Sequence, residues 1–217
     1  MSADAAVVSA IYDSYDTVKP VCPQRGLDVE WILVTDDPDL RAPGWTVVYE
    51  PRPGMHPNRA AKGPKFRPDR YTSAPASVWV DASFRVTSPT FVMEALSYAD
   101  PIAQFVHPWR DCVYTEAEAS ADLPKYWGEP IEGQAKYYRA AGHPEHWGLW
   151  ATGVIARKHT LRTAKMGALW GQEVNVWSFQ DQLSQPYVLW TMDLRPTSLP
   201  GTHFANDWLA YEGSGRH

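Results

Sequence analysis

The stretch VWVDASFRV, residues 78–86, contains the pattern that decides the fold. It continues an apolar run, Ala76–Val80, that is typical of a buried β-strand, and a carboxylate, Asp81, follows where the run ends. An ionised Asp beside a core is costly unless it is paired, hydrogen-bonded or bound to a metal. Asp81 therefore either closes an ordinary turn or takes part in the chemistry of a site.

The same design, an apolar strand that ends in polar residues, recurs along the chain. Residues 29–37, VEWILVTDD, end in two carboxylates, and residues 5–12 are followed by Asp13. Segments with helical signals lie between such runs, and strands that alternate with helices are typical of a largely parallel sheet. We therefore expect an α/β fold: a single domain over residues 1–217 with a mostly parallel central sheet flanked by helices. The other expected strands are 45–50, 76–80, 101–108 and 148–159.

The helices are predicted from the residues at their ends. Ser88 before a proline predicts an N-cap, Asn58 is the expected cap of a short helix that begins with NRAAK, and Gly142 predicts a helix end. Pro186 predicts that the last helix is bent or interrupted, and the tail from Pro196 onward has the composition of a loop. The longer expected helices cover residues 88–99, 114–123, 131–142, 160–174 and 178–190.

The composition of the chain limits the partners and the cellular compartment that we expect for the protein. The chain of 217 residues carries a formal net charge of -5, which does not favour nucleic acid as a default partner. Its two cysteines, Cys22 and Cys112, form neither a CxxC motif nor a disulfide framework, which is typical of a reducing compartment. No run approaches the ~20 apolar residues of a membrane span, and the N-terminal residues lack a cationic leader. The sequence therefore predicts a soluble, cytoplasmic protein without a membrane span.

Polar residues at the strand ends are candidates for a binding site. In an open α/β sheet the ligand binds beyond the carboxyl ends of the strands, where Asp13, Asp36 and Asp81 are expected. P-loop, dinucleotide and α/β-hydrolase signatures are absent from the sequence, so those chemistries lose support. A Mn²⁺ or Mg²⁺ ion that holds a diphosphate needs few protein ligands, and Asp81, Ser83 and the distant His203 would suffice. An Asp followed two positions later by Ser is equally an ordinary turn.

Two further segments allow two interpretations each. HPWRDCVYTEAEA, residues 107–119, contains Arg110, which either clamps a carboxylate or phosphate or pairs with a neighbouring carboxylate such as Glu116. FQDQLS places Asp181 at an expected helix start, where either Ser178 or Asp181 caps the helix or Asp181 serves catalysis.

Taken together, these pieces resemble a known family. The chain is similar to the glycosyltransferase-like domain family that includes bacterial proteins of unassigned role and the plant mucilage and turgor-regulation proteins. The resemblance covers residues 9 to about 190 and rests on AIYDSYD, WILVTDD, the lysine of GPKF, VWVDASFRV, HPWRDCVYTEAEA, GLWATGVIARKH and FQDQLS. The most specific pieces are the W-x-D-A, H-P-x-R-D-C-x-Y-x-E and D-Q-L-S blocks, which occur here together and in this order.

The resemblance implies a fold and a set of site residues. That family is similar to nucleotide-sugar transferases of the GT-A type, which have a Rossmann-like sheet and a metal-binding aspartate at a strand end. Carried over by position, Asp81 would bind the cation and diphosphate, Ser83 stands where a second carboxylate is usual, and Gln180 stands where an arginine is expected. His203 would join the metal set by analogy with other GT-A enzymes. The remaining implied residues are Lys65 against the donor, Tyr12 and Asp13 near the base or ribose, Arg110 at donor oxygens, Asp181 and Gln182 beside the sugar, and Glu116 as the next candidate for the catalytic base.

Three functions are compatible with these features. The first is transfer of a sugar from a nucleotide-diphosphate sugar, with a UDP-sugar as the expected donor and Mn²⁺ or Mg²⁺ as the expected cation. Its acceptor would be a glycan, a lipid, a protein or a modified nucleobase in DNA, so nucleic acid enters only as an acceptor. The second is hydrolysis of the nucleotide sugar. The third is a non-catalytic carbohydrate- or nucleotide-binding module, for which the 11 Trp residues are the only positive sign.

Overall fold

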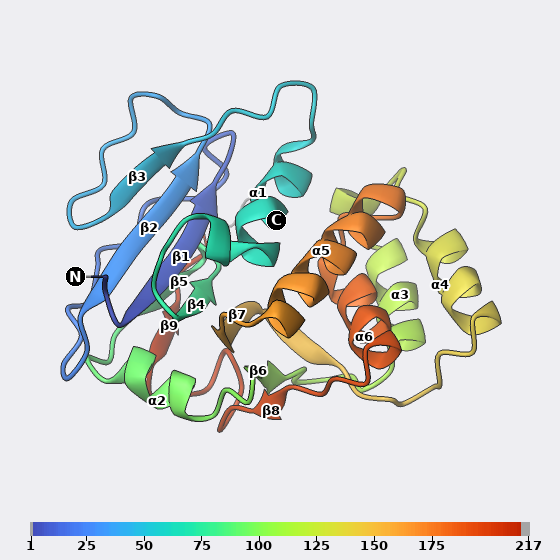
Figure 1. The fold of residues 1–217 in the computed structure, drawn as a ribbon. Helices are drawn as coiled ribbons and strands as arrows, with labels where there is room; N and C mark the ends of the chain where they lie inside the picture. The colour runs from blue at the N-terminus through green and yellow to red at the C-terminus, as the bar shows by residue number, and fades with distance from the viewer. Residues whose placement is uncertain (1, 214–217) are drawn as a thin grey trace.

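In the computed structural model, which describes residues 2–213, a seven-stranded sheet runs through the molecule with helices on both faces (Figure 1). Its strands are β1 (Ala5–Ile11), β2 (Val29–Thr35), β3 (Thr46–Tyr49), β4 (Ala76–Val80), β6 (Ile102–Val106), β7 (Trp150–Lys158) and β8 (Thr197–Ser198). They lie in the order β3-β2-β1-β4-β7-β6-β8, and neighbours among the first four are parallel. β7 is antiparallel to both β4 and β6, whereas β6 and β8 are parallel. The expected α/β fold with a mostly parallel sheet is confirmed.

Alternation along the strands buries the sheet on both faces. In β1, Ala6 and Val8 pack into the core on one face, whereas Ala5 and Val7 pack into the core on the other. All seven residues of β1 are buried. A central strand covered on both sides needs apolar residues at every position, which is why its sequence is a continuous apolar run.

The larger core lies between one face of the sheet and a group of helices. The helices of this group are α1 (Pro57–Phe66), α3 (Val113–Ala121), α4 (Ile131–Ala140), α5 (Leu161–Val176) and α6 (Asp181–Thr191), and the short 3-10 helices η1 (Pro68–Arg70) and η2 (Pro124–Tyr126) lie in their connections. α5 packs against both α1 and α6, and α3 packs against α4 and α6. Figure 1 shows α3 to α6 as one group beside the sheet.

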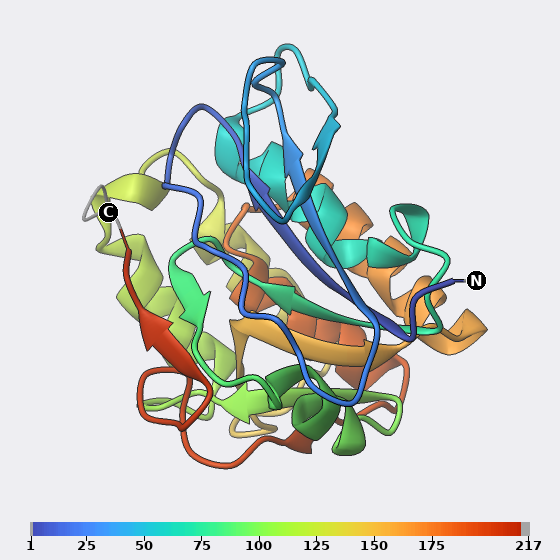
Figure 2. The same ribbon diagram turned by 90° about the vertical axis from the view of Figure 1, so that its left-hand side faces the viewer.

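The opposite face is covered by α2 (Phe91–Ser97) and by a small sheet made of β5 (Phe84–Val86) and β9 (Leu209–Tyr211). Figure 2 shows β9, in red, beside β5, in green, although the two are far apart in the sequence. The prediction that the tail from Pro196 is loop was therefore wrong in part, because β8 and β9 both lie there. Strands this short contain too few residues for an alternating pattern to show.

Two predicted helix starts were wrong. α1 is capped by His56, whose Nδ1 accepts a hydrogen bond from Asn58 N at 3.3 Å. The proline between them favours the first helical position, so the residue before it becomes the cap. α2 begins after Thr90, and the Ser88 hydroxyl instead accepts a hydrogen bond from Thr90 N at 3.3 Å in the turn before the helix. The predicted end of α4 is confirmed, because Gly142 follows that helix with a φ of 88°, a conformation that favours glycine.

α1 and α5 approach each other closely at a glycine. A side-chain carbon at Gly167 would lie only 1.9 Å from the carbonyl oxygen of Phe66, so no other residue fits without moving the backbone. Four residues later in α5, a side-chain carbon at Gly171 would lie 3.4 Å from Phe66 Cδ2, which is an ordinary contact. The contact of the two helices therefore depends on Gly167 and not on Gly171.

We expect Gly167→Ala to lower the free energy of unfolding by about 1–3 kcal/mol, because the added methyl group forces the two helices apart. Gly171→Ala is the matched control: it gains helix propensity without a clash, so it should raise the free energy of unfolding by up to about 1 kcal/mol. Urea denaturation of both variants measures the difference. Equal stability of the two would mean that the backbone at Phe66 moves away without cost.

Candidate functional site

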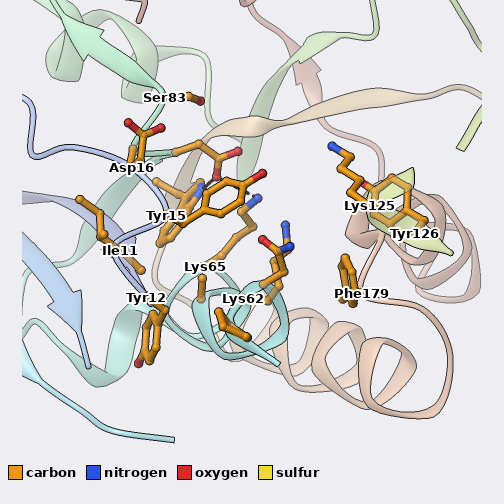
Figure 3. Close-up of a pocket in the computed structure, with 17 residues that line it drawn as sticks. Ile11, Tyr12, Tyr15, Asp16, Lys62, Lys65, Ser83, Lys125, Tyr126 and Phe179 are labelled. Atoms are coloured by element: carbon orange, nitrogen blue, oxygen red, sulfur yellow. Dashed lines mark hydrogen bonds and ion pairs between the residues drawn. The ribbon is translucent and has the colours of Figure 1, made fainter. Parts of the chain in front are cut away.

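A pocket opens at the carboxyl ends of β1 and β4 (Figure 3). Parallel strands bring their carboxyl ends to one edge of the sheet, and ligands bind there in open α/β folds. In Figure 3, Lys62 and Lys65 extend from α1, while Lys125 and Tyr126 of η2 lie across from Tyr15. The polar and charged side chains that line the pocket are Tyr12, Tyr15, Asp16, Asn58, Lys62, Lys65, Asp81, Ser83, Lys125 and Tyr126.

Asp81 stands directly after β4 and remains bonded to β7. Its backbone N–H donates to Gly153 O at 2.8 Å, and its carbonyl accepts from the N–H of Phe84. Its Oδ1 accepts from Trp79 Nε1 at 2.6 Å and lies 3.0 Å from Lys65 Nζ. The side chain is 35% exposed, and Oδ2 has no hydrogen-bond or ion-pair partner within residues 2–213. Asp81 therefore closes a turn and also keeps one carboxylate oxygen available to a ligand.

Lys65 is the centre of a buried ion-pair network. Its Nζ lies 3.0 Å from Asp81 Oδ1 and 2.8 Å from Asp181 Oδ2, and its side chain is 1% exposed. Lys62 Nζ lies 3.1 Å from the other oxygen of Asp181, which also accepts from Thr152 Oγ1 at 3.3 Å. The network joins α1 to the end of β4 and to the first residue of α6.

The side chains in and near this network differ in how strongly the fold favours their charged forms. Burial by itself would raise the pKa of Asp181, but Lys62 and Lys65 lower that pKa to about 2. Burial opposes the charged form of Lys65, but Asp181 and Asp81 outweigh it and raise the pKa of Lys65. Burial lowers the pKa values of Lys62 and Lys125 despite nearby carboxylates. The ammonium groups of Lys62 and Lys125 are therefore the ones that an anionic ligand would stabilise most.

Asp181 lies behind the pocket wall. It is the first residue of α6, where Gln180 is the N-cap residue without a side-chain capping bond, so Asp181 is not a cap. Ser178 is not a cap either, because its hydroxyl donates to Gln134 Oε1 at 2.6 Å. Both oxygens of Asp181 are engaged by lysines of α1. A catalytic role for Asp181 stays a prediction, and the geometry shows it holding the two lysines.

Glu116 forms a second buried polar cluster. Its Oε1 accepts from Gln182 Nε2 at 3.0 Å and from Gln180 Nε2 at 3.2 Å, and its Oε2 pairs with Arg110 Nε. Arg110 thus forms an ion pair with Glu116, as one of its two interpretations expected. The side chains of this cluster, Glu116, Gln182, Gln180 and Arg110, do not line the pocket. Catalytic roles for Glu116 and Gln182 and donor binding by Arg110 stay predictions.

Of the pair expected in the loop after β1, Tyr12 reaches the pocket and Asp13 does not. Tyr12 lines the pocket, and its hydroxyl donates to Glu50 O at 2.9 Å. Asp13 is exposed and does not line the pocket, and its N–H donates to Asp36 Oδ1 at 3.0 Å. A φ of 54° at Asp13 turns the chain there, so that Tyr15 enters the pocket wall instead.

The sequence of the chain also matches a known family. The sequence profile of the family described as TOD1/MUCI70, glycosyltransferase-like domain, matches residues 41–204, which is more than half of the chain. The chain belongs to the TOD1/MUCI70 glycosyltransferase-like domain family. A search of the curated proteins finds no match.

The match to the TOD1/MUCI70 family covers most of the site. It includes Lys65, Asp81 and Asp181 and extends to His203, beyond the region in which the resemblance was expected. It begins after Tyr12, so it lends no support to the base-binding role expected of that residue. Within residues 2–213, no helix combines the length and the apolar character needed to cross a membrane.

The residues expected to hold Mn²⁺ or Mg²⁺ each keep one polar side-chain atom without a partner within residues 2–213. Asp81 Oδ2 and the Ser83 hydroxyl have no hydrogen-bond partner among the described residues, and His203 Nδ1 is buried without one. Burial, with a smaller effect of His107, lowers the pKa of His203 to about 4, so its ring is neutral at pH 7. No three His, Cys, Asp or Glu side chains in the described part of the chain gather to hold a metal by themselves. Asp81 and Ser83 line the pocket whereas His203 does not, so a shared cation-binding role for the three stays a prediction.

Sequence reasoning missed two of the pocket lysines. Lys62 lies three residues before Lys65, a spacing that places both on one face of a helix, so this signal was available. Lys125 gave no such signal, because it reaches the pocket from η2, far along the chain. Its position depends on how the segment between β6 and β7 folds back over the site.

The lowered pKa of Asp181 predicts a loss of stability in acid. Its contribution is fully present above the pKa of an unfolded Asp, near 4, and disappears as the pH falls toward 2. The wild-type protein should therefore lose about 2 kcal/mol more than Asp181→Asn over this interval. Chemical denaturation between pH 5 and pH 2.5 measures the difference, with the exposed Asp39→Asn as the control. Parallel pH profiles for wild type and Asp181→Asn would contradict the assignment.

Proposed function

We propose that the chain is a glycosyltransferase that moves a sugar from a nucleotide-diphosphate sugar, with a UDP-sugar as the expected donor, to an acceptor. The observation that carries the proposal is the grouping of Lys62, Lys65 and Lys125 beside Asp81 in the pocket at the strand ends. Three ammonium groups from two separate elements suit a ligand with several negative charges, as a diphosphate has. Membership of a glycosyltransferase-like family supports the same reading.

In this proposal the lysines bind the diphosphate both while it is still attached to the sugar and after it has left. The bond between the anomeric carbon and the diphosphate oxygen breaks, and its electron pair stays on the diphosphate. The acceptor hydroxyl oxygen bonds to the anomeric carbon and gives up its proton to a base. Lys62 and Lys125, whose charged forms are destabilised by burial, gain most as negative charge develops on the leaving group. Asp181 acts by holding Lys62 and Lys65 in place.

The same pocket supplies surfaces for the remainder of the donor. We propose that the nucleobase packs on the aromatic side chains of Tyr15, Tyr126 and Phe179, which line the pocket with Tyr12. Gln182 and Glu116 are proposed to lie near the transferred sugar, with Glu116 orienting the Gln182 amide through their 3.0 Å hydrogen bond. Arg110, paired with Glu116, is the proposed contact to donor oxygens beyond the pocket wall.

We also propose that a Mn²⁺ or Mg²⁺ ion assists, held by Asp81, Ser83 and His203. When bound, such an ion neutralises charge on the diphosphate. Asp81 would offer its free Oδ2, while Trp79 and Lys65 keep Oδ1 fixed and so orient the carboxylate. The unpaired cysteines, Cys22 and Cys112, suit the cytoplasmic location that we propose for the protein.

Donor binding is tested by thermal melting with nucleotide sugars that differ in base, with and without Mn²⁺. A donor at about 100 times its Kd should raise the Tm by roughly 5–10 °C. Lys62→Met should weaken donor binding about 10- to 100-fold, because a charge-assisted contact is lost. The exposed Lys165→Met is the matched control and should bind as wild type. If none of the nucleotide sugars binds, the proposed function is wrong.

Turnover is tested with Asp81→Asn. This variant keeps the size of the side chain but loses the charge that holds Lys65 and the proposed cation, so sugar transfer should fall about 100-fold or more. Donor consumption is measured with and without an acceptor mixture, and circular dichroism checks the fold. Consumption that does not depend on acceptor would identify a hydrolase, and near-normal transfer by a folded variant would remove Asp81 from the mechanism.

A further inference from the structure

Three aromatic side chains from separate parts of the chain form an exposed surface, here called the aromatic shelf. It consists of Trp109, Phe204 and Tyr211, which are 69%, 46% and 47% exposed. The ring centroids of Trp109 and Phe204 are 5.7 Å apart, and those of Phe204 and Tyr211 are 5.3 Å apart. Large aromatic rings in mutual contact are seldom left in water unless the surface has a use.

The shelf is supported from beneath. Trp109 follows β6, Phe204 lies in the loop between β8 and β9, and Tyr211 ends β9. The buried ring of Phe84 packs under two of them, with its centroid 6.3 Å from that of Phe204 and 5.4 Å from that of Tyr211. The pairing of β5 with β9, visible in Figure 2, fixes Tyr211 opposite Phe84. The packing of Phe84 and the pairing of β5 with β9 thus hold the shelf in place.

The shelf adjoins Asp81. A side-chain carbon at Gly153 would lie 3.4 Å from Asp81 Oδ2 and 3.0 Å from Phe84 Cε2, so the free oxygen of Asp81 and the ring under the shelf flank the same glycine. Ser83, which lines the donor pocket, accepts a hydrogen bond through its carbonyl from Glu212 N at 2.7 Å, one residue beyond Tyr211. The donor pocket and the shelf therefore meet at residues 81–84.

We propose that the aromatic shelf is the acceptor site and that the acceptor is a carbohydrate chain, an inference that rests on the proposed function. The apolar faces of sugar rings pack on exposed aromatic rings. The shelf carries no charge, and the neighbouring Arg85 is paired with Glu212 at 2.7 Å. A nucleic-acid acceptor would need a cationic track along its backbone, which these residues do not provide. A glycan seated on Phe204 and Tyr211 would lie beside residues 81–84, where the shelf adjoins the donor pocket.

The test probes the full chain against an array of immobilised oligosaccharides, with single-stranded and duplex DNA in parallel. We expect the wild-type protein to bind glycans and not DNA, and Trp109→Ala or Phe204→Ala to weaken that binding about tenfold. Trp109→Phe keeps an aromatic ring and should retain most of the binding. Tyr49→Ala is the control, because Tyr49 is an equally exposed aromatic residue on β3 at the far edge of the sheet.

Thermal shifts with UDP, measured on the same variants, separate this inference from the proposed function. Unchanged UDP shifts with weakened glycan binding support the shelf as an acceptor site distinct from the donor pocket. Absence of glycan binding by the wild-type protein, binding of DNA instead, or full glycan binding by Trp109→Ala overturns the inference, whatever the UDP result. Glycan binding without a thermal shift by UDP or by any of the nucleotide sugars would leave the shelf as a carbohydrate site and remove the proposed function.

Discussion

Lys65 carries a positive charge into the interior, and a buried charge is stable only when partners of opposite charge surround it. Asp81 and Asp181 provide these partners at 3.0 and 2.8 Å, and they come from the end of β4 and the start of α6. Removal of one partner of such a network costs about 3–5 kcal/mol, because the remaining charge stays buried. The positions of α1, β4 and α6 are therefore coupled through one ammonium group.

α1 serves two purposes because its two faces differ. Lys62 and Lys65 line the pocket, whereas Phe66 on the packing side contacts Trp170 of α5 in a tilted arrangement with ring centroids 4.5 Å apart. The close contact at Gly167 holds α5 against this end of α1. The helix is thereby fixed from behind, so its lysines stay at the sheet edge even without a ligand. A pre-positioned set of charges avoids the cost of reorganisation when an anion binds.

The C-terminal tail packs against residues 83–86, which directly follow Asp81. Its loop between β8 and β9 carries His203 and Phe204 as neighbours, and their rings are in contact at 3.9 Å between centroids. One segment thus contributes a candidate metal ligand and part of the aromatic shelf. In our proposal, donor and acceptor approach Asp81 from two sides: the donor from α1 and η2, the acceptor from β9 and the loop after β6.

The sequence predicted the helical segments and six strands of the large sheet, β1, β2, β3, β4, β6 and β7, because apolar runs and helical spacing are local properties of the chain. Asp81 was also identified from sequence, since a carboxylate at the end of an apolar strand is visible without partners. The tertiary structure alone decided that β7 runs antiparallel, that Lys125 reaches the pocket, and that Asp181 is buried behind it. These outcomes depend on hydrogen bonds, ion pairs and burial between residues distant in the chain, whose energies exist only once the fold has brought the partners together.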